Sequence, residues 1–159
     1  MTQTNLGSIY VNLADARDGQ QNLAKAAEAY ESVLKVYTIE SNAPGYAAVQ
    51  NNLGVVYGNL AEVGQREENL VKAIAAYENA LRVYTSEDSQ ESCASVQNNL
   101  GVAYFNLADI RDAEENLVKA IAAYENALEI RTMDRFPMQY ALTQKNLGIA
   151  HAKLSEIGD

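Results

Sequence analysis

The chain of 159 residues has no tryptophan, two prolines, one cysteine and one histidine. A lone cysteine cannot form a disulfide within the chain, so a reducing cytoplasm is the simplest setting. One cysteine and one histidine cannot supply the spacings typical of metal sites, so we expect no metal and no other cofactor. Because the sequence also has no glycine-rich phosphate loop and no recognisable nucleophile–histidine pair, we expect no enzyme activity.

Basic residues are also scarce, with 12 Lys and Arg against 21 Asp and Glu and a net charge of −9. Nucleic acids and anionic membranes are recognised by basic patches, so we expect neither as a partner. No apolar run approaches the roughly 18 residues of a membrane span. The first ten residues lack the charged and then apolar pattern of a signal peptide. Apolar residues make up 48% of the chain, which is enough for a sizeable core.

The main feature that the sequence does have is an internal repeat. The triplet Asn-Leu-Gly begins at Asn5, Asn52, Asn99 and Asn146, with a constant spacing of 47 residues. Residues 52–81 are nearly repeated at 99–128, a weaker copy opens at the first triplet and a half copy opens at the last. A fixed period of this size indicates repeats that stack and share a continuous core.

Each copy predicts two amphipathic helices joined by a turn. In the second copy, apolar residues recur at helical spacing from Leu53 to Leu60 and again from Leu70 to Leu81. The small residues Ala73 and Ala80 allow two helices to approach closely, and Tyr77 fills the space between them. No strand-like alternation competes with this pattern, so we expect an all-α fold.

These positions resemble the tetratricopeptide repeat (TPR) pattern, which has a Leu-Gly pair, an aromatic residue one turn later and a small–aromatic–small stripe on the second helix. The residues that carry the resemblance are Leu53, Gly54, Tyr57, Ala73, Tyr77 and Ala80, then Leu100, Gly101, Tyr104, Ala120, Tyr124 and Ala127, and in the first copy Leu6, Gly7, Tyr10, Ala26 and Tyr30, with Val33 replacing the last small residue. The resemblance covers nearly the whole chain. It implies a right-handed superhelical α-solenoid of helix-turn-helix repeats.

Two features depart from the usual pattern. The period is 47 residues, whereas the common TPR period is about 34, so we expect longer helices, as in long-period repeats of bacterial type. The place often held by tryptophan is held by Gln50, Gln97 and Gln144. The period would also suit HEAT or armadillo repeats, but the Leu-Gly pairs and the small–Tyr–small stripes argue against both.

We expect a single TPR-like domain over residues 1–159. Its predicted parts are repeat 1 at about 2–40, repeat 2 at about 45–87, repeat 3 at about 92–134 and a C-terminal capping helix at about 139–157. The second helix is expected to end near Thr38, and residues 41–45 to form a loop with Pro44 at the start of the third helix. A capping box is expected at Asp112. The last helix either caps the final pair, or the chain is a piece of a longer array.

The resemblance implies that the first helix of each pair lines a concave face. The candidate peptide-binding residues on that face are Asn5, Asn12, Asn52, Val55, Asn59, Asn99, Val102, Phe105, Asn106 and Asn146. An Asn amide can accept from one backbone group and donate to another. Packed helices lie about 9–10 Å apart and an extended strand advances about 3.3 Å per residue, so one Asn per repeat would meet about every third peptide unit. Alternatively, the asparagines hold neighbouring helices together.

The resemblance implies a protein–protein interaction module that binds an extended peptide or partner segment. The alternative is a structural spacer or self-associating scaffold element of a larger multidomain signalling protein, with association through the end helices. Some members of the family grip a C-terminal carboxylate, but Thr4, Ser8, Ser95 and Asn99 stand where most of the gripping groups would be. Only Asn52 fits that pattern, so we expect no such clamp.

Overall fold

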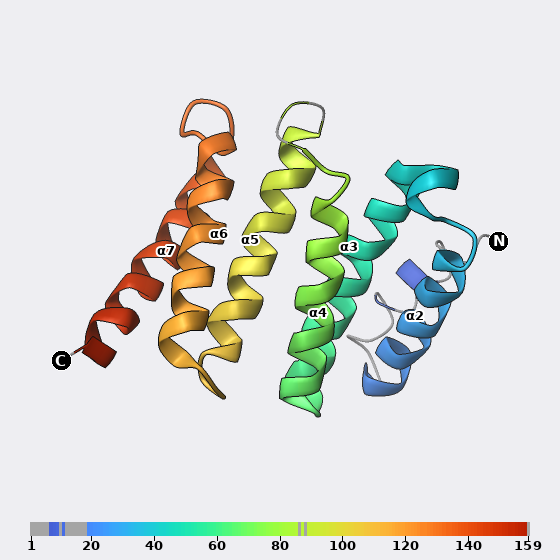
Figure 1. Cartoon of the computed structure of the whole chain (residues 1–159), viewed down its shortest axis with the longest axis horizontal. Coiled ribbons are helices and arrows are strands. Elements are labelled where there is room, and N and C mark those ends of the chain that lie inside the picture. The colour runs from blue at the N-terminus through green and yellow to red at the C-terminus, as the bar shows by residue number, and fades with distance from the viewer. Residues whose placement is uncertain (1–6, 10, 12–18, 86, 88, 159) are drawn as a thin grey trace. The chain divides into compact units, whose positions relative to one another are not determined.

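The computed structural model describes residues 7–9, 11, 19–85, 87 and 89–158. Every regular element within those ranges is a helix, which confirms the all-α fold class. The chain forms two compact units, Met1–Val83 and Tyr84–Asp159 (Figure 1). The first unit holds the two repeats that were predicted first, and the second unit holds the third repeat and the last helix.

The first unit contains residues 7–9 and 11, which are helical, followed by helices α2 (Gly19–Leu34), α3 (Ile39–Val63) and α4 (Arg66–Leu81). Helix α3 packs against both α2 and α4 (Figure 1). The predicted end of the second helix near Thr38 is wrong because Thr38 caps the next helix instead. Its hydroxyl accepts from the Ser41 amide at 3.1 Å, and the Ser41 hydroxyl accepts from the Thr38 amide at 2.9 Å.

The predicted loop at residues 41–45 is also wrong, because these residues lie inside α3 around a kink. Asn42 has φ −161° and ψ 76°, which interrupts the helix after its first turn. The Asn42 side-chain oxygen then accepts from the Gly45 amide at 3.1 Å and caps the longer segment that follows. Pro44 lies in the first turn of that segment, as predicted, where its missing amide hydrogen removes no helical bond.

The second unit contains helices α5 (Gln90–Leu107), α6 (Ala113–Ile130) and α7 (Pro137–Gly158). Helix α6 packs against both α5 and α7. Leu147 and Leu154 of α7 lie against a buried cluster formed by Ala120, Ile121, Tyr124 and Ala150. Helix α7 therefore packs against the apolar side of the third repeat within this unit.

The turns between paired helices use a left-handed residue in place of a side-chain cap. Gln65 has φ 46° before α4 and Asp112 has φ 47° before α6, and neither side chain caps its helix. The predicted capping box at Asp112 is wrong because the left-handed backbone turns its carboxylate away from the helix start. Instead Asn116 donates to the Arg111 carbonyl at 2.9 Å, and Asn69 donates to the Gly64 carbonyl at 2.9 Å.

Candidate functional site

The candidate site is the exposed surface of the first helix in each pair, called here the first-helix face. The predicted residues that the structure describes lie on three helices: Asn52, Val55 and Asn59 on α3, Asn99, Val102, Phe105 and Asn106 on α5, and Asn146 on α7. Asn59 and Val102 are exposed and the others are half-buried. The predicted residues Asn5 and Asn12 lie outside the described residues.

Two of the predicted residues line a hollow in the first unit. This hollow has a volume of about 210 Å³ and is lined by Ser8, Val11, Tyr30, Asn52 and Val55. Its base includes the buried Tyr30, whose hydroxyl lies 3.1 Å from the Ser8 hydroxyl. The hollow therefore combines hydroxyl groups, small aliphatic side chains and one amide.

Three more predicted residues line a hollow in the second unit. This hollow has a volume of about 110 Å³ and is lined by Val102, Phe105, Tyr124, Asn146 and Ile149. Each lining residue follows its counterpart in the first unit by 94 residues, which is two repeat periods. Tyrosine and asparagine are the same in both. In the second hollow Val102 replaces Ser8, and the larger Phe105 and Ile149 replace two valines. The second hollow is therefore smaller and more apolar.

The asparagines of the first-helix face differ from the other asparagines in what they bond. The side chains of Asn52, Asn99 and Asn146 are half-buried and make no hydrogen bond with any residue in the described ranges. By contrast, the buried Asn69 and Asn116 each donate to a backbone carbonyl in a turn. Asn69 and Asn116 are thus bonded within their units, whereas the amides of Asn52, Asn99 and Asn146 keep their hydrogen-bonding capacity.

Phe105 takes part in both packing and the hollow of the second unit. It lies against the buried cluster around Tyr124 and also lines the hollow. The Lys153 ammonium lies 4.5 Å from the centre of the Phe105 ring and forms an ion pair with Asp109. Lys153 is therefore held in place over the aromatic ring rather than being solvated on its own.

A buried polar network in the second unit was not predicted from the sequence. The Arg131 guanidinium is buried and donates to Glu91 at 3.1 Å and to the Thr143 hydroxyl at 3.4 Å. The one hydrogen of the Thr143 hydroxyl is shared between two acceptors, the Asn98 side-chain oxygen at 3.1 Å and the Gln139 carbonyl at 2.9 Å. These groups connect α5, the end of α6 and α7. The one sequence signal was that Arg131 and Thr143 stand where the preceding repeat has Tyr84 and Val96.

The tyrosines that follow the Leu-Gly pairs on α3 and α5, Tyr57 and Tyr104, contact charged side chains. In the first unit the Tyr57 hydroxyl donates to the Glu31 carboxylate, and the Lys72 ammonium lies 5.5 Å from the centre of the Tyr57 ring. Burial, and after it the contact with the Glu31 carboxylate, raises the pKa of Tyr57. In the second unit Lys119 lies 5.6 Å from the centre of the Tyr104 ring.

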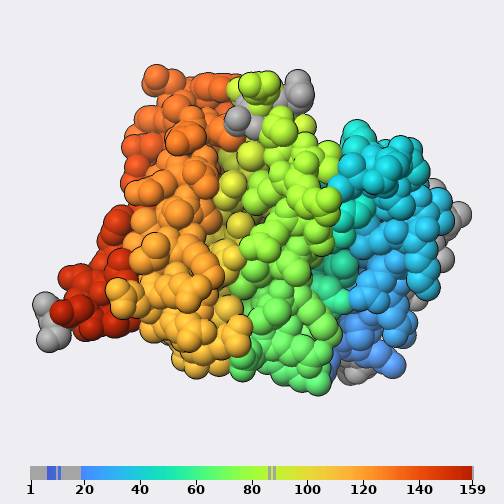
Figure 2. Space-filling view, viewed as in Figure 1, coloured from blue at the N-terminus to red at the C-terminus, as the bar shows by residue number. Residues whose placement is uncertain are grey.

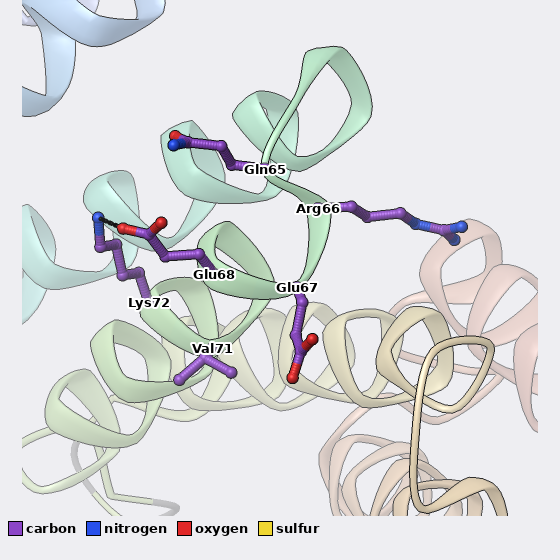
Figure 3. Close-up of a pocket in the computed structure, with 6 residues that line it drawn as sticks. All are labelled: Gln65, Arg66, Glu67, Glu68, Val71 and Lys72. Carbon is purple, nitrogen blue, oxygen red and sulfur yellow. Dashed lines mark hydrogen bonds and ion pairs between the residues drawn. The ribbon is translucent and has the colours of Figure 1, made fainter.

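A wider hollow of about 610 Å³ lies at the start of α4 (Figure 3). It is lined by Gln65, Arg66, Glu67, Glu68, Val71 and Lys72. Figure 3 shows these side chains spreading in different directions, and Lys72 donates to Glu68 at 2.7 Å. Since its polar groups do not converge on a common point, we do not consider this hollow a candidate site.

The groups that could support other functions are few in the described parts of the chain. No cluster of three or more His, Cys, Asp or Glu residues that could hold a metal ion exists within them. Cys93 is buried, and burial raises the pKa of its thiol, which makes the thiolate nucleophile scarce. His151 is exposed. Of the helices described, none has the length and apolar character needed to cross a membrane.

Comparison with protein families gives two matches, both to models described as tetratricopeptide repeat, over residues 55–126 and 11–62. Repeats of this kind generally mediate protein–protein interaction, typically bind proteins or peptides and are typically non-catalytic. Both matches and the helical structure fit an all-α solenoid. A search of curated proteins gave no significant match.

Among solved structures, the crystal structure of BtubC (BKLC) from P. vanneervenii is similar to this chain. The two are 27% identical in sequence, with a TM-score of 0.59. The similarity covers 94% of this chain and 57% of that chain, so this chain corresponds to somewhat more than half of it.

Proposed function

We propose that this chain, which belongs to the tetratricopeptide repeat family, binds an extended segment of a partner protein on the first-helix face and performs no catalysis. The observation that carries this proposal is the recurrence of one hollow in both units, with an unbonded asparagine at the same position in each. These half-buried amides make no hydrogen bond within the described residues, so their donors and acceptors are available to a bound peptide.

In this proposal the amides hold the backbone of the bound segment. Asn52, Asn99 and Asn146 each offer one acceptor and one two-hydrogen donor, which matches the carbonyl and amide of a peptide unit. One such residue per repeat would meet about every third peptide unit of an extended chain. Asn59 on α3 and Asn106 on α5 lie seven residues beyond Asn52 and Asn99 on the same helices and would extend the contact.

Side-chain preference would come from the hollows beside the amides. In the first unit Val55 and the Ser8 and Tyr30 hydroxyls favour a small or hydroxyl-bearing side chain. In the second unit Val102 and Phe105 favour an aliphatic side chain, because they line a small and mostly apolar hollow of about 110 Å³. Within each unit, the bound segment would therefore be selected mostly by shape at the hollow and held by its backbone elsewhere.

The test uses a peptide selected from a random display library on the wild-type chain. The variants Asn52→Ala and Asn146→Ala each remove one amide, and each hydrogen bond lost should contribute about 0.5–1.5 kcal/mol. We expect each variant to bind the selected peptide about 5- to 150-fold more weakly by calorimetry, because an amide can make two such bonds, which together contribute about 1–3 kcal/mol. The thermal midpoint of unfolding should not change.

The matched control is Asn126→Ala, which removes an exposed amide from the second helix of the third repeat. It should leave both affinity and thermal stability unchanged. If Asn52→Ala and Asn146→Ala lower the thermal midpoint and the selected peptide binds as before, the asparagines support the stack of helices, and the chain is better described as a spacer or scaffold element.

A further inference from the structure

The buried tyrosine in the hollow of the second unit has a hydroxyl without a bonding partner. Tyr124 of α6 is 2% exposed. The other residues that line this hollow are Val102, Phe105, Asn146 and Ile149. The Tyr124 hydroxyl makes no hydrogen bond with any residue in the described ranges. Because buried polar groups in folded proteins nearly always have a partner, this hydroxyl points to a ligand in the hollow.

The orientation of the Tyr124 ring places its hydroxyl at the first-helix face. A Cβ added to Gly101 would lie 2.5 Å from the ring atom Cε1 and 3.0 Å from Cζ, the carbon that bears the hydroxyl. The hydroxyl end of the ring therefore reaches α5 beside Val102, while Figure 2 shows the outer surface of α6 lying over α5. In the described part of this unit, the fully enclosed side-chain atoms without a partner are Glu91 Oε2 and Arg131 Nε. The Tyr124 hydroxyl is therefore accessible from the hollow.

The first unit shows which group bonds a tyrosine at this position. There the Tyr30 hydroxyl lies 3.1 Å from the Ser8 hydroxyl. Ser8 and Val102 are counterparts two repeat periods apart, and so are Tyr30 and Tyr124. The second unit thus keeps the tyrosine but has valine, which can neither donate nor accept, in place of the serine. A hydroxyl supplied by the ligand would make the bond that Ser8 makes in the first unit.

The walls of the hollow determine which hydroxyl-bearing side chain would fit best. They are formed mainly by Val102, Phe105 and Ile149, around a volume of about 110 Å³. A valine of the ligand would suit these walls but would leave the buried phenol without a partner, which is unfavourable. Threonine carries a methyl group and a hydroxyl on the same carbon, so it can contact the walls and bond the phenol together. Burial raises the pKa of Tyr124, so its hydroxyl keeps the proton and can donate.

We propose that the hollow of the second unit binds a threonine side chain of the bound segment, with the Tyr124 hydroxyl as its hydrogen-bonding partner and the apolar walls against its methyl group. This inference rests on the proposed function, since it takes the first-helix face to bind an extended segment. It adds a polar requirement to the aliphatic preference of the walls. Tyr124 is then the residue that distinguishes threonine from valine.

The test places threonine, valine and serine in turn at each position of the peptide selected on the wild-type chain, and measures affinity by calorimetry. We expect one position at which threonine binds about 2- to 13-fold more tightly than valine, the effect of one neutral hydrogen bond. Serine, which lacks the methyl group, should also bind more weakly there. In Tyr124→Phe the preference for threonine over valine should disappear. Stability should be unchanged, because the hydroxyl has no bond to lose among the described residues.

The outcomes separate this proposal from the proposed function. If the peptide binds but no position prefers threonine to valine and serine, or the preference survives in Tyr124→Phe, the threonine assignment is wrong and the proposed function stands. If no peptide binds the wild-type chain, the proposed function fails and this proposal fails with it.

The variant Val102→Ser tests the same bond from the side of α5. Its hydroxyl should bond Tyr124 as Ser8 bonds Tyr30, so the preference for threonine over valine should again disappear. The matched control is Tyr77→Phe, which removes a hydroxyl that has no hydrogen bond in the described ranges and lines neither hollow. It should leave the preference unchanged. Loss of the preference in Tyr77→Phe as well would overturn the proposal, because the effect would not depend on the hollow.

Discussion

Gly54 on α3 lies directly under the ring of Tyr77 on α4, so close that a Cβ on residue 54 would be 2.5 Å from the ring atom Cε1. The same relationship joins Gly101 to Tyr124 at 2.5 Å, and a Cβ on Gly7 would lie 2.7 Å from the Tyr30 ring. Gly7, Gly54 and Gly101 therefore have a steric function, because each glycine leaves room for the tyrosine that packs between paired helices.

Substitution Gly54→Ala should destabilise the first unit. The added methyl group must displace the buried Tyr77 ring, and overpacking of this kind costs about 1–3 kcal/mol. Alanine also stabilises a helix by up to about 1 kcal/mol relative to glycine, which partly offsets the loss. Urea unfolding followed by circular dichroism measures the net change.

The control for this prediction is Gly58→Ala, one turn further along the same helix. A Cβ there meets nothing within 4 Å, so only the helical preference remains and the midpoint should rise slightly. If Gly54→Ala and Gly58→Ala stabilise the chain equally, the tyrosine moves aside at little cost and the steric function assigned to Gly54 is wrong.

Substitution Thr143→Val should destabilise the second unit, although valine is the residue at the matching positions 49 and 96. Valine nearly keeps the shape of threonine but removes the hydroxyl that donates to Asn98 and accepts from Arg131. Leaving the buried Asn98 acceptor unsatisfied costs about 1–3 kcal/mol. Thr143→Ser keeps the hydroxyl and serves as the control in urea unfolding.

A double-mutant cycle with Asn98→Ala isolates this bond. Since residues in direct contact couple, the two losses should sum to more than the loss in the double variant, by at least about 0.5 kcal/mol. Strict additivity would mean that the Thr143–Asn98 contact contributes nothing to the stability of the unit.

The helical class and the pairing of helices could be predicted from the sequence because they follow from repetition. Apolar periodicity and the small–Tyr–small stripes depend only on helix geometry, and the stripe of Ala73, Tyr77 and Ala80 is buried as the pattern requires. Helix α4 also has Glu67 and Glu68 in its first turn, where the helix dipole favours negative charge.

The helix ends and the polar network were predicted less well because they depend on backbone angles and on partners distant in sequence. The sequence pattern predicts that the Asp112 side chain caps α6, but Asp112 has a left-handed backbone and makes no capping hydrogen bond. Asn42 and Thr38 both suit a cap, and the sequence alone does not show that one helix uses both. For Asn98, the bonding partner Thr143 lies 45 residues away on another helix, which no local pattern reveals.

Stability should fall at alkaline pH because of the buried tyrosines. Burial raises the pKa of Tyr57, Tyr77 and Tyr124 above the usual 10.0. The unfolded chain therefore loses these protons first as pH rises, so the folded state binds more protons above pH 10.0 and stability decreases there. Below pH 10.0 these groups are protonated in both states and contribute no pH dependence.

The measurement is a series of urea midpoints from about pH 8 to about pH 11. Tyrosinate absorbance follows ionisation without interference, because the chain has no tryptophan. The variant Tyr124→Phe removes one titrating group and should reduce the slope above pH 10.0. A midpoint that stays constant across this range would show that the rings ionise equally in the folded and unfolded chain.

Substitution Val102→Ser should change which side chain the hollow of the second unit accepts, if the first-helix face binds a peptide as proposed. Serine is the counterpart of Val102 in the first unit, where Ser8 bonds with Tyr30, so the variant makes the second hollow resemble the first. Val102 is 37% exposed, which should keep the cost to stability small. Losing this apolar contact should weaken binding of a selected peptide with an aliphatic side chain there by about 1 kcal/mol, or fivefold.

The control Val118→Ser changes an equally apolar residue, 52% exposed on α6, that does not line the hollow, and should have no effect. If both variants lose peptide affinity equally, the effect comes from the added surface polarity, and the hollow is not part of the binding site.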